Sequence, residues 1–192
     1  MTRKRRGKNS GSPHTRVKTS RLQRTSKSAG RKARILPFPK IVRLVQRAKE
    51  RGSKIVTTNG CFDILHVGHV RYLSYAKKLG DLLIVGVNSD DSVRKLKGVG
   101  RPICPERERA EVVASLRSVD AVFIFDDTTP MRWLKILKPD VHVKGADRSM
   151  REIVERKAVR SYGGRVVLAP FHKGRSTSAV IRTVTHYHSL LT

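Results

Sequence analysis

The sequence has few cysteines, few aromatic residues and no long apolar run. Its two cysteines, Cys61 and Cys104, lie far apart without a C-x-x-C pattern, which argues against a disulfide framework or a zinc site. No stretch is long enough to span a bilayer, and no apolar segment follows the early charges as a secretory signal requires. We therefore expect a soluble protein of the cytoplasm. Cys61 is interpreted as a small residue in a tight loop.

Acidic residues are missing from residues 1–36, which contain thirteen Lys and Arg residues. This segment has almost no aromatic residues and no apolar period, so it cannot bury enough surface to offset the entropy of ordering. We predict a disordered basic tail. It could contact nucleic acid, attract anionic lipid, act as a transit peptide or be a solvated extension. Residues 37–192 keep 29 basic and 15 acidic residues, a net charge of +14.

The body alternates short apolar runs with helical patterns about five times. Such alternation predicts a parallel sheet with right-handed crossovers. The expected fold is α/β: a single Rossmann-like domain over 37–192, with a five-stranded parallel sheet and helices on both faces. The predicted strands cover residues 54–58, 82–87, 120–125, 139–144 and 165–169.

The body is organised around the turn that joins the first of these strands to a helix. Gly60 and Gly68 allow close approach of the backbone to a ligand, and turns tolerate Asn59. His66 and His69 are three residues apart and fall on one side of a helical turn. The first turn of a helix presents free N–H groups that bind anions, and imidazole can donate to phosphate oxygens or add charge when protonated. By themselves, two such histidines would more often be surface residues or half of a metal site.

Further charged residues follow the later strands. Lys95 and Lys97 are predicted on a mobile loop that could close on a triphosphate, although a plain exposed basic loop has the same composition. Arg109 and Arg117 are eight residues apart on a predicted helix and could project from the same side. Asp147, just after a strand, could accept hydrogen bonds from ribose or cap the next helix.

Two motifs in this order resemble the nucleotidyltransferase superfamily, which includes cytidylyltransferases and sugar-phosphate adenylyltransferases. The first is the H-x-G-H run Asn59–His69, and the second is the Ser/Thr cluster 174–178, which lacks the Lys of a P-loop. Residues 54–184 look most like the adenylyltransferase that makes ADP-heptose for lipopolysaccharide. That likeness runs through Val87-Asn88-Ser89-Asp90, Leu96-Lys97-Gly98, Arg101-Pro102, Asp127-Thr128-Thr129-Pro130, Pro139-Asp140, Val143-Lys144-Gly145 and Gly163-Gly164.

The resemblance implies transfer of AMP from ATP to a heptose 1-phosphate, with Mg²⁺ bound to ATP, no metal ligand in the protein and release of pyrophosphate. It implies catalytic roles for His66, His69 and Lys97, with Lys95, Arg109 and Arg117 on phosphate or sugar phosphate. The nucleotide would contact Asn59, Gly60, Phe62, Asp63, Gly68, Asp147, Ser176, Thr177 and Ser178. Relatives often form homodimers, and another chain would have to phosphorylate the sugar.

Other functions remain open at this point. A cytidylyltransferase acting on glycerol 3-phosphate, or an FAD-forming adenylyltransferase, would use the same chemistry. Phe171 and His172 stand where cytidylyltransferase relatives have an arginine nearby, which favours ATP over CTP. A hypothesis of another class is a basic nucleic-acid-binding protein built on an inactive nucleotidyltransferase-like body.

Overall fold

The computed structural model describes Met1 and residues 34–145, 153–170 and 177–191. The strands are β1 Arg34–Ile35, β2 Ile55–Gly60, β3 Leu82–Asn88, β4 Ala121–Phe125, β5 Val141–Gly145 and β6 Arg165–Ala169. The helices are α1 Phe38–Glu50, α2 Val67–Lys77, α3 Asp90–Lys97, α4 Glu106–Ala114, α5 Met131–Leu137, α6 Glu155–Ser161 and α7 Thr177–Leu191. Among these helices, none combines the length and the apolar character needed to cross a membrane.

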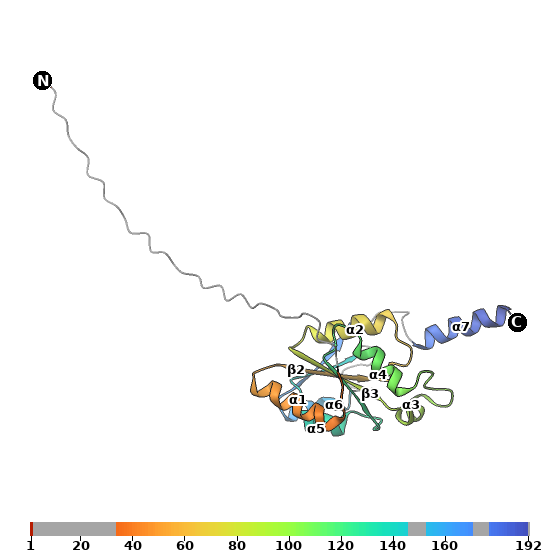
Figure 1. The fold of residues 1–192 in the computed structure, drawn as a ribbon, viewed down its shortest axis with the longest axis horizontal. Helices are drawn as coiled ribbons and strands as arrows, with labels where there is room; N and C mark the ends of the chain where they lie inside the picture. Colours follow the sequence, from red (N-terminus) through yellow and green to blue (C-terminus); the bar gives the residue numbers. More distant parts are fainter. Residues whose placement is uncertain (2–33, 146–152, 171–176, 192) are drawn as a thin grey trace. The chain divides into compact units, whose positions relative to one another are not determined.

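The strands form one parallel sheet in the order β1-β4-β3-β2-β5-β6. In Figure 1 the strands β2 and β3 lie between α2 and α4 on one side and α1 and α5 on the other. The predicted α/β fold and its five strands are confirmed, and the structure adds a sixth, β1. This strand has only two residues, Arg34 and Ile35, which pair with Ala121 and Val122 at the start of β4. It lies inside the segment predicted as tail, so the folded body begins before residue 37. Two residues are too few to show a strand period in a sequence.

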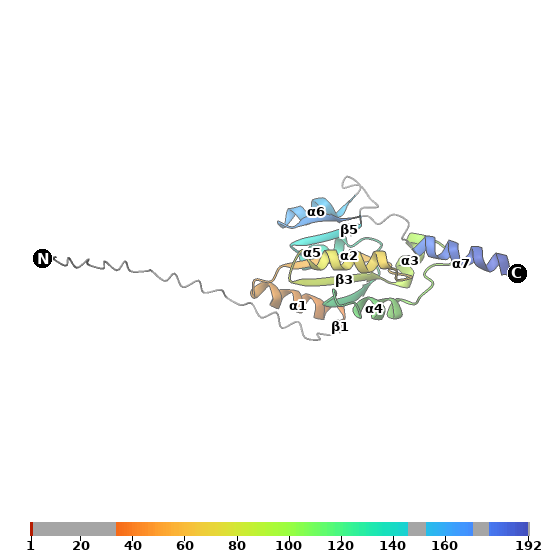
Figure 2. The same cartoon turned by 90° about the horizontal axis from the view of Figure 1, so that it is seen from above.

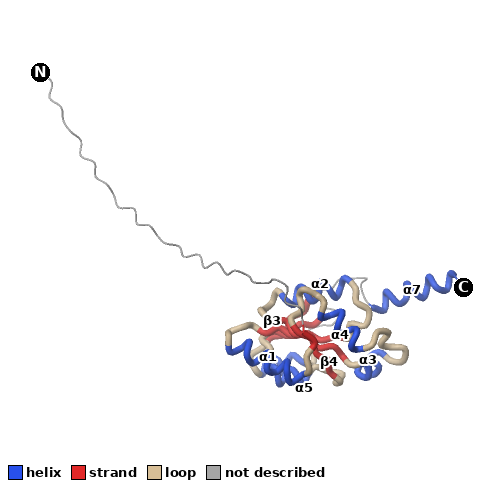
Figure 3. Tube along the Cα trace, in the orientation of Figure 1, coloured by secondary structure: helices blue, strands red, loops and turns tan. Residues whose placement is uncertain are grey.

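Helices cover both faces of the sheet (Figure 3). One core cluster joins α2 and α4 to the sheet, through residues such as Leu73 and Val113. The other joins α1 and α5, through residues such as Ile41 and Leu134. Because β3 lies between the two clusters, all seven of its residues are buried, which explains its continuous apolar sequence.

The order of the strands determines where a ligand can bind. The chain runs from β2 outward through β3 to β4, and then crosses to β5 and β6 on the other side of β2. The direction of winding therefore reverses between β2 and β5. In open parallel sheets such a reversal leaves a crevice at the carboxyl ends of the two strands, where ligands bind. Gly60 ends β2 and Gly145 ends β5, so this crevice adjoins the H-x-G-H turn.

Candidate nucleotidyl-transfer site

The two histidines of the turn lie against each other. His66 is the N-cap of α2, and its Nδ1 accepts a hydrogen bond from the backbone N–H of Gly68 at 3.1 Å. The rings of His66 and His69 stack with centroids 3.9 Å apart and planes 26° apart. The prediction that both imidazoles share one side of the first turn is confirmed. Both therefore lie beside the free N–H groups and the positive end of the α2 dipole.

Burial determines the charge of His69. Burial, and to a smaller extent the neighbouring His66, lowers the pKa of this imidazole from 6.5 to about 4. At neutral pH His69 is therefore uncharged and can donate a hydrogen bond without first losing a proton. Its buried Nδ1 has no hydrogen-bond partner among the described residues. A ligand oxygen or a water could supply that partner.

Gly60 and Phe62 shape the floor of the turn. Phe62 has a φ of 48°, in the left-handed region, and its ring meets His69 edge-on with centroids 5.2 Å apart. A Cβ on Gly60 would lie only 3.1 Å from the Phe62 ring. A side chain at position 60 would therefore push Phe62 against His69, which explains the glycine.

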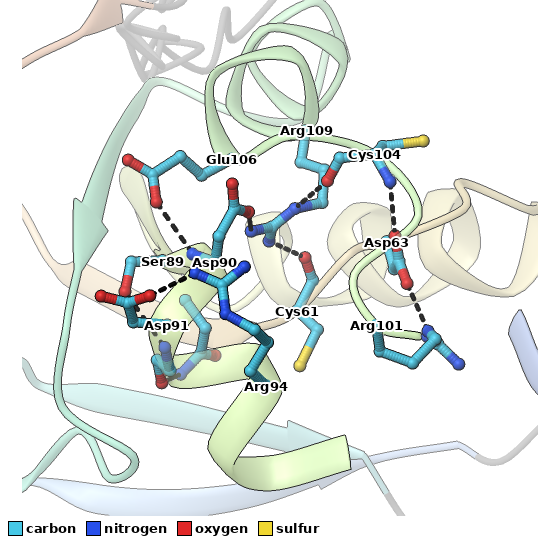
Figure 4. A network of polar contacts seen from close by, with 12 residues as sticks. Cys61, Asp63, Ser89, Asp90, Asp91, Arg94, Arg101, Cys104, Glu106 and Arg109 are labelled. Atoms are coloured by element: carbon cyan, nitrogen blue, oxygen red, sulfur yellow. Dashed lines mark hydrogen bonds and ion pairs between the residues drawn. The ribbon is translucent and has the colours of Figure 1, made fainter. Parts of the chain in front are cut away.

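Asp63 connects the H-x-G-H turn to the loop before α4. Its Oδ1 accepts hydrogen bonds from the N–H groups of Ile103 at 2.8 Å and Cys104 at 3.0 Å, and Arg101 Nε donates to Oδ2 at 2.5 Å (Figure 4). Burial opposes ionisation of this carboxyl, but the hydrogen bonds from Cys104, Arg101 and Ile103 lower its pKa overall. Only 3% of Asp63 is exposed, and its carboxylate binds groups of the protein itself. Its predicted contact with nucleotide stays a prediction.

Arg109 makes three contacts with the protein from the first turn of α4 (Figure 4). Its guanidinium donates to Asp90 Oδ1 at 2.7 Å, to the Cys61 carbonyl at 2.5 Å and to the Cys104 carbonyl at 2.8 Å. Only 1% of Arg109 is exposed. The structure therefore gives Arg109 a positioning role that ties the turn to α3 and α4, whereas we expected it to bind phosphate.

The two lysines predicted on a mobile loop lie instead in the last turn of α3. Both are exposed, and Gly98 ends the helix with a φ of 88°. Burial raises the pKa of the Cys61 thiol, and the positive charge of Lys97 is the strongest effect that opposes this rise. The charge of Lys97 therefore reaches the H-x-G-H turn. The predicted roles of Lys97 in catalysis and of Lys95 in phosphate binding stay predictions.

The prediction that Arg109 and Arg117 project from one side of a helix is wrong. Helix α4 ends at Ala114, so Arg117 lies in the turn that leads to β4. A turn before a strand is at the amino end of the sheet, opposite the crevice. The proposed phosphate contact of Arg117 has no support from this position.

The start of α7 approaches the same turn. Thr177 Oγ1 donates to the Ile64 carbonyl at 3.3 Å, and Ser178 is exposed in the next position. This contact brings Thr177 of the second motif to the first motif. Ser176 and Asp147, which were also predicted to bind nucleotide, lie outside the described residues.

Lys144 is a residue of the crevice that we did not single out from the sequence. It lies near the end of β5, and its Nζ donates to Asn59 Oδ1 at 3.2 Å and to Glu155 Oε1 at 2.9 Å. This ammonium therefore joins β2 to α6 across the point where the winding reverses. The sequence offered a clue, since Lys144 lies near the end of a buried strand as Asn59 does, but the ion pair with Glu155 is formed only in the fold.

His142 makes a testable contribution to the pH dependence of stability. It is fully buried, with Nδ1 3.0 Å from Thr57 Oγ1, and burial holds its pKa well below 6.5. Since the unfolded chain takes up a proton near pH 6.5 and the folded chain does not, stability must fall as pH decreases from 6.5. The slope is up to about 1.4 kcal/mol per pH unit for each such histidine.

His69 also stays neutral in the folded chain down to about pH 4, so it adds a similar slope to the unfolding free energy. Replacement of His142 should therefore remove roughly half of this pH dependence. We expect His142→Gln to give a shallower loss of unfolding free energy than the parent protein in urea titrations between pH 6.5 and 5. The difference between the two proteins should be constant above pH 7.5. An equally steep loss in the variant would contradict a neutral buried His142.

Paired histidines at the start of a helix, beside the crevice of a parallel sheet, are the arrangement expected of a nucleotidyltransferase. The model of the cytidylyltransferase-like family matches residues 57–183, and the chain belongs to this family. The matched region includes the H-x-G-H turn, Lys97, Lys144 and the start of α7.

Curated relatives carry the name Bifunctional protein HldE. That of Geotalea uraniireducens is 49% identical over 152 residues, which are 79% of this chain and 31% of the relative. That of Geobacter metallireducens is 51% identical over 149 residues, 78% of this chain and 30% of the relative. The chain thus spans about a third of the length of these relatives.

Solved structures give the same fold. A lipopolysaccharide core biosynthesis protein from Thermoplasma volcanium is 31% identical with a TM-score of 0.56, over 64% of this chain and 100% of the other. A pantoate-beta-alanine ligase from Francisella tularensis has a TM-score of 0.55 at 14% identity, over 76% and 69% of the two chains. The second similarity concerns the fold alone.

Proposed function

We propose that this chain transfers AMP from ATP to a sugar 1-phosphate, namely D-glycero-β-D-manno-heptose 1-phosphate, and releases pyrophosphate. The observation that carries the proposal is the stacked pair His66 and His69 beside the crevice between β2 and β5. The choice of sugar rests on the resemblance to ADP-heptose-forming enzymes and on about 50% identity to the HldE proteins. The similarity to a lipopolysaccharide core biosynthesis protein from Thermoplasma volcanium supports the same choice.

The chemistry is an in-line displacement at the α-phosphorus of ATP. An oxygen of the sugar phosphate forms a new bond to this phosphorus, while the bond to the bridging oxygen breaks and pyrophosphate leaves. His66 and His69 would donate hydrogen bonds to the α-phosphate oxygens as negative charge develops, assisted by the α2 dipole. Lys97 would neutralise the departing pyrophosphate. No covalent intermediate with the enzyme is needed, since positioning and charge stabilisation suffice.

Magnesium is part of the proposal as a partner of ATP. Mg²⁺ is commonly held by substrate phosphates and water, and it supplies charge neutralisation when it is bound. Within the described ranges no three His, Cys, Asp or Glu side chains gather as a metal site. The residues next to the phosphates would therefore be the cationic Lys97 and the imidazoles.

Lys144 provides a test of the crevice as the place of binding. Replacement by Met removes the ammonium from Asn59 Oδ1 and leaves the nearly buried Glu155 carboxylate without its partner. We expect kcat/KM for ATP to fall at least tenfold, because the edge of β2 that would hold the nucleotide loses its support. Lys157→Met, on the exposed side of α6, is the matched control and should stay within twofold. Equal kinetics for both variants would remove Lys144 from the site.

Pyrophosphate release tests the choice of substrates. Purified protein with Mg²⁺ should release pyrophosphate with ATP and the heptose 1-phosphate, and at most slowly with CTP or with glycerol 3-phosphate. Release with CTP and glycerol 3-phosphate alone would make the protein a cytidylyltransferase acting on an alcohol phosphate. Release with ATP and FMN would indicate FAD formation. Silence of the folded protein in all combinations would contradict the proposal and favour the nucleic-acid hypothesis.

A further inference from the structure

A basic groove lies beside the β1 edge of the sheet. It has a volume of about 260 Å³ and is lined by four basic residues, Arg34, Lys40, Arg43 and Arg47, with Leu36 and Leu44 as its apolar floor. Arg34 comes from β1, and the other three basic residues come from α1. We call this set of six residues the α1 groove.

The charges of the α1 groove are exposed and have no acidic partner among the described residues. All four basic side chains are exposed, and none of them takes part in an ion pair within the described part of the chain. The only acidic residue of α1 is Glu50, at the end of the helix. Four cations at one edge of the sheet without counterions repel one another, and an anionic partner would lower this repulsive energy.

The α1 groove is separate from the nucleotidyl-transfer site. In the sheet order, β1 is the edge strand next to β4, whereas the crevice lies between β2 and β5. The two edges are distinguishable in Figure 2, where α1 accompanies β1 and α6 accompanies the opposite edge. The site chemistry therefore does not account for these charges.

We propose that the α1 groove binds the phosphodiester backbone of a nucleic acid. Three of its four cations are arginines, whose planar guanidinium groups match phosphate oxygens in a bidentate manner. Lys40, Arg43 and Arg47 follow one face of α1 over about 10 Å, a length in which one strand carries about three phosphates. Twelve further Lys and Arg residues precede Arg34, with no acidic residue among them.

The residues of the groove favour nucleic acid over a lipid surface. A helix that lies in a membrane inserts its apolar side, but the apolar residues Ile41 and Val45 of α1 are buried in the core of the protein. The groove also lacks aromatic side chains on which bases could stack. Binding therefore depends on the backbone of the nucleic acid, is independent of base sequence and weakens steeply with salt.

The test compares two full-length variants that lose the same charge. The first replaces Arg34, Lys40, Arg43 and Arg47 by Gln. The control replaces four exposed cations of α5 and α6, Arg132, Lys135, Lys157 and Arg160, by Gln. Binding to a fluorescent 20-nucleotide RNA of mixed sequence is measured by anisotropy between 50 and 200 mM salt, and circular dichroism checks the fold of each variant.

We expect the groove variant to bind at least tenfold more weakly at 100 mM salt, with a salt slope smaller by about 3, since each lost phosphate contact removes about 0.7. The control should stay within threefold of the parent protein. Equal losses of affinity in both variants would show that net charge alone causes the effect, and would overturn the proposal. Unchanged binding of the groove variant would overturn it as well. Groove-dependent binding to vesicles of anionic phosphatidylglycerol, without binding to RNA, would also overturn it in favour of a lipid surface.

Discussion

Replacement of His69 by alanine is expected to lower kcat about a hundredfold, with little change in KM for ATP. The imidazole would act on the α-phosphate mainly when negative charge develops, so its loss raises the barrier by about 3 kcal/mol without weakening the ground-state complex equally. Its position supports this role, since it stacks on His66 at 3.9 Å in the first turn of α2. Steady-state kinetics with saturating sugar phosphate measures the effect.

A second substitution separates hydrogen bonding from charge. His69→Asn keeps a side-chain N–H and should recover part of the lost rate, because the pKa of His69 near 4 makes it an uncharged donor at neutral pH. The parent rate should accordingly show no ionisation of this residue between pH 6 and 8. A rate that is unchanged in His69→Ala would exclude His69 from the mechanism.

Replacement of Arg109 by methionine should destabilise the fold by about 3 kcal/mol. Methionine fills much of the same space, but it leaves Asp90 and the carbonyls of Cys61 and Cys104 without their donor. Removal of the fully buried guanidinium leaves three acceptors without a donor, and a loss of this kind typically costs about this much. Urea unfolding at pH 7.5 provides the measurement.

The control for Arg109 is its neighbour on the same helix. Arg107→Met removes an equal charge from an exposed position of α4 and should change the unfolding free energy by less than about 0.5 kcal/mol. Similar values for the two variants would contradict the positioning role of Arg109. If Arg109 instead bound phosphate directly, stability would stay near that of the parent while KM for ATP rose.

Local patterns were sufficient to predict the sheet and the histidine turn. The strand that contains Leu82–Val87 is apolar throughout because it is buried on both faces, and that property is visible in the sequence. The spacing of His66 and His69 predicted that both lie on one side of the helix, because one helical turn contains both. The two-residue strand β1 has no comparable pattern and owes its conformation to pairing with β4.

Contacts between distant segments could not be predicted in the same way. Asp63 and Arg109 look like ligand residues in the sequence, but their partners Arg101, Asp90 and Cys104 come from other segments and bury both of them. The expectation for Arg117 failed because nothing in the apolar spacing marked the end of α4 at Ala114. Lys144 was missed because its role depends on Glu155, which α6 brings to the crevice.

The fate of the α-phosphate of ATP tests the central claim most directly. The protein is incubated with Mg²⁺, heptose 1-phosphate and ATP labelled at either the α- or the γ-phosphorus, and the products are separated. Nucleotidyl transfer predicts that the α-label appears in ADP-heptose and the γ-label in an equal amount of pyrophosphate. Transfer of the γ-label to the sugar, or absence of the α-label from any sugar product, would contradict the claim.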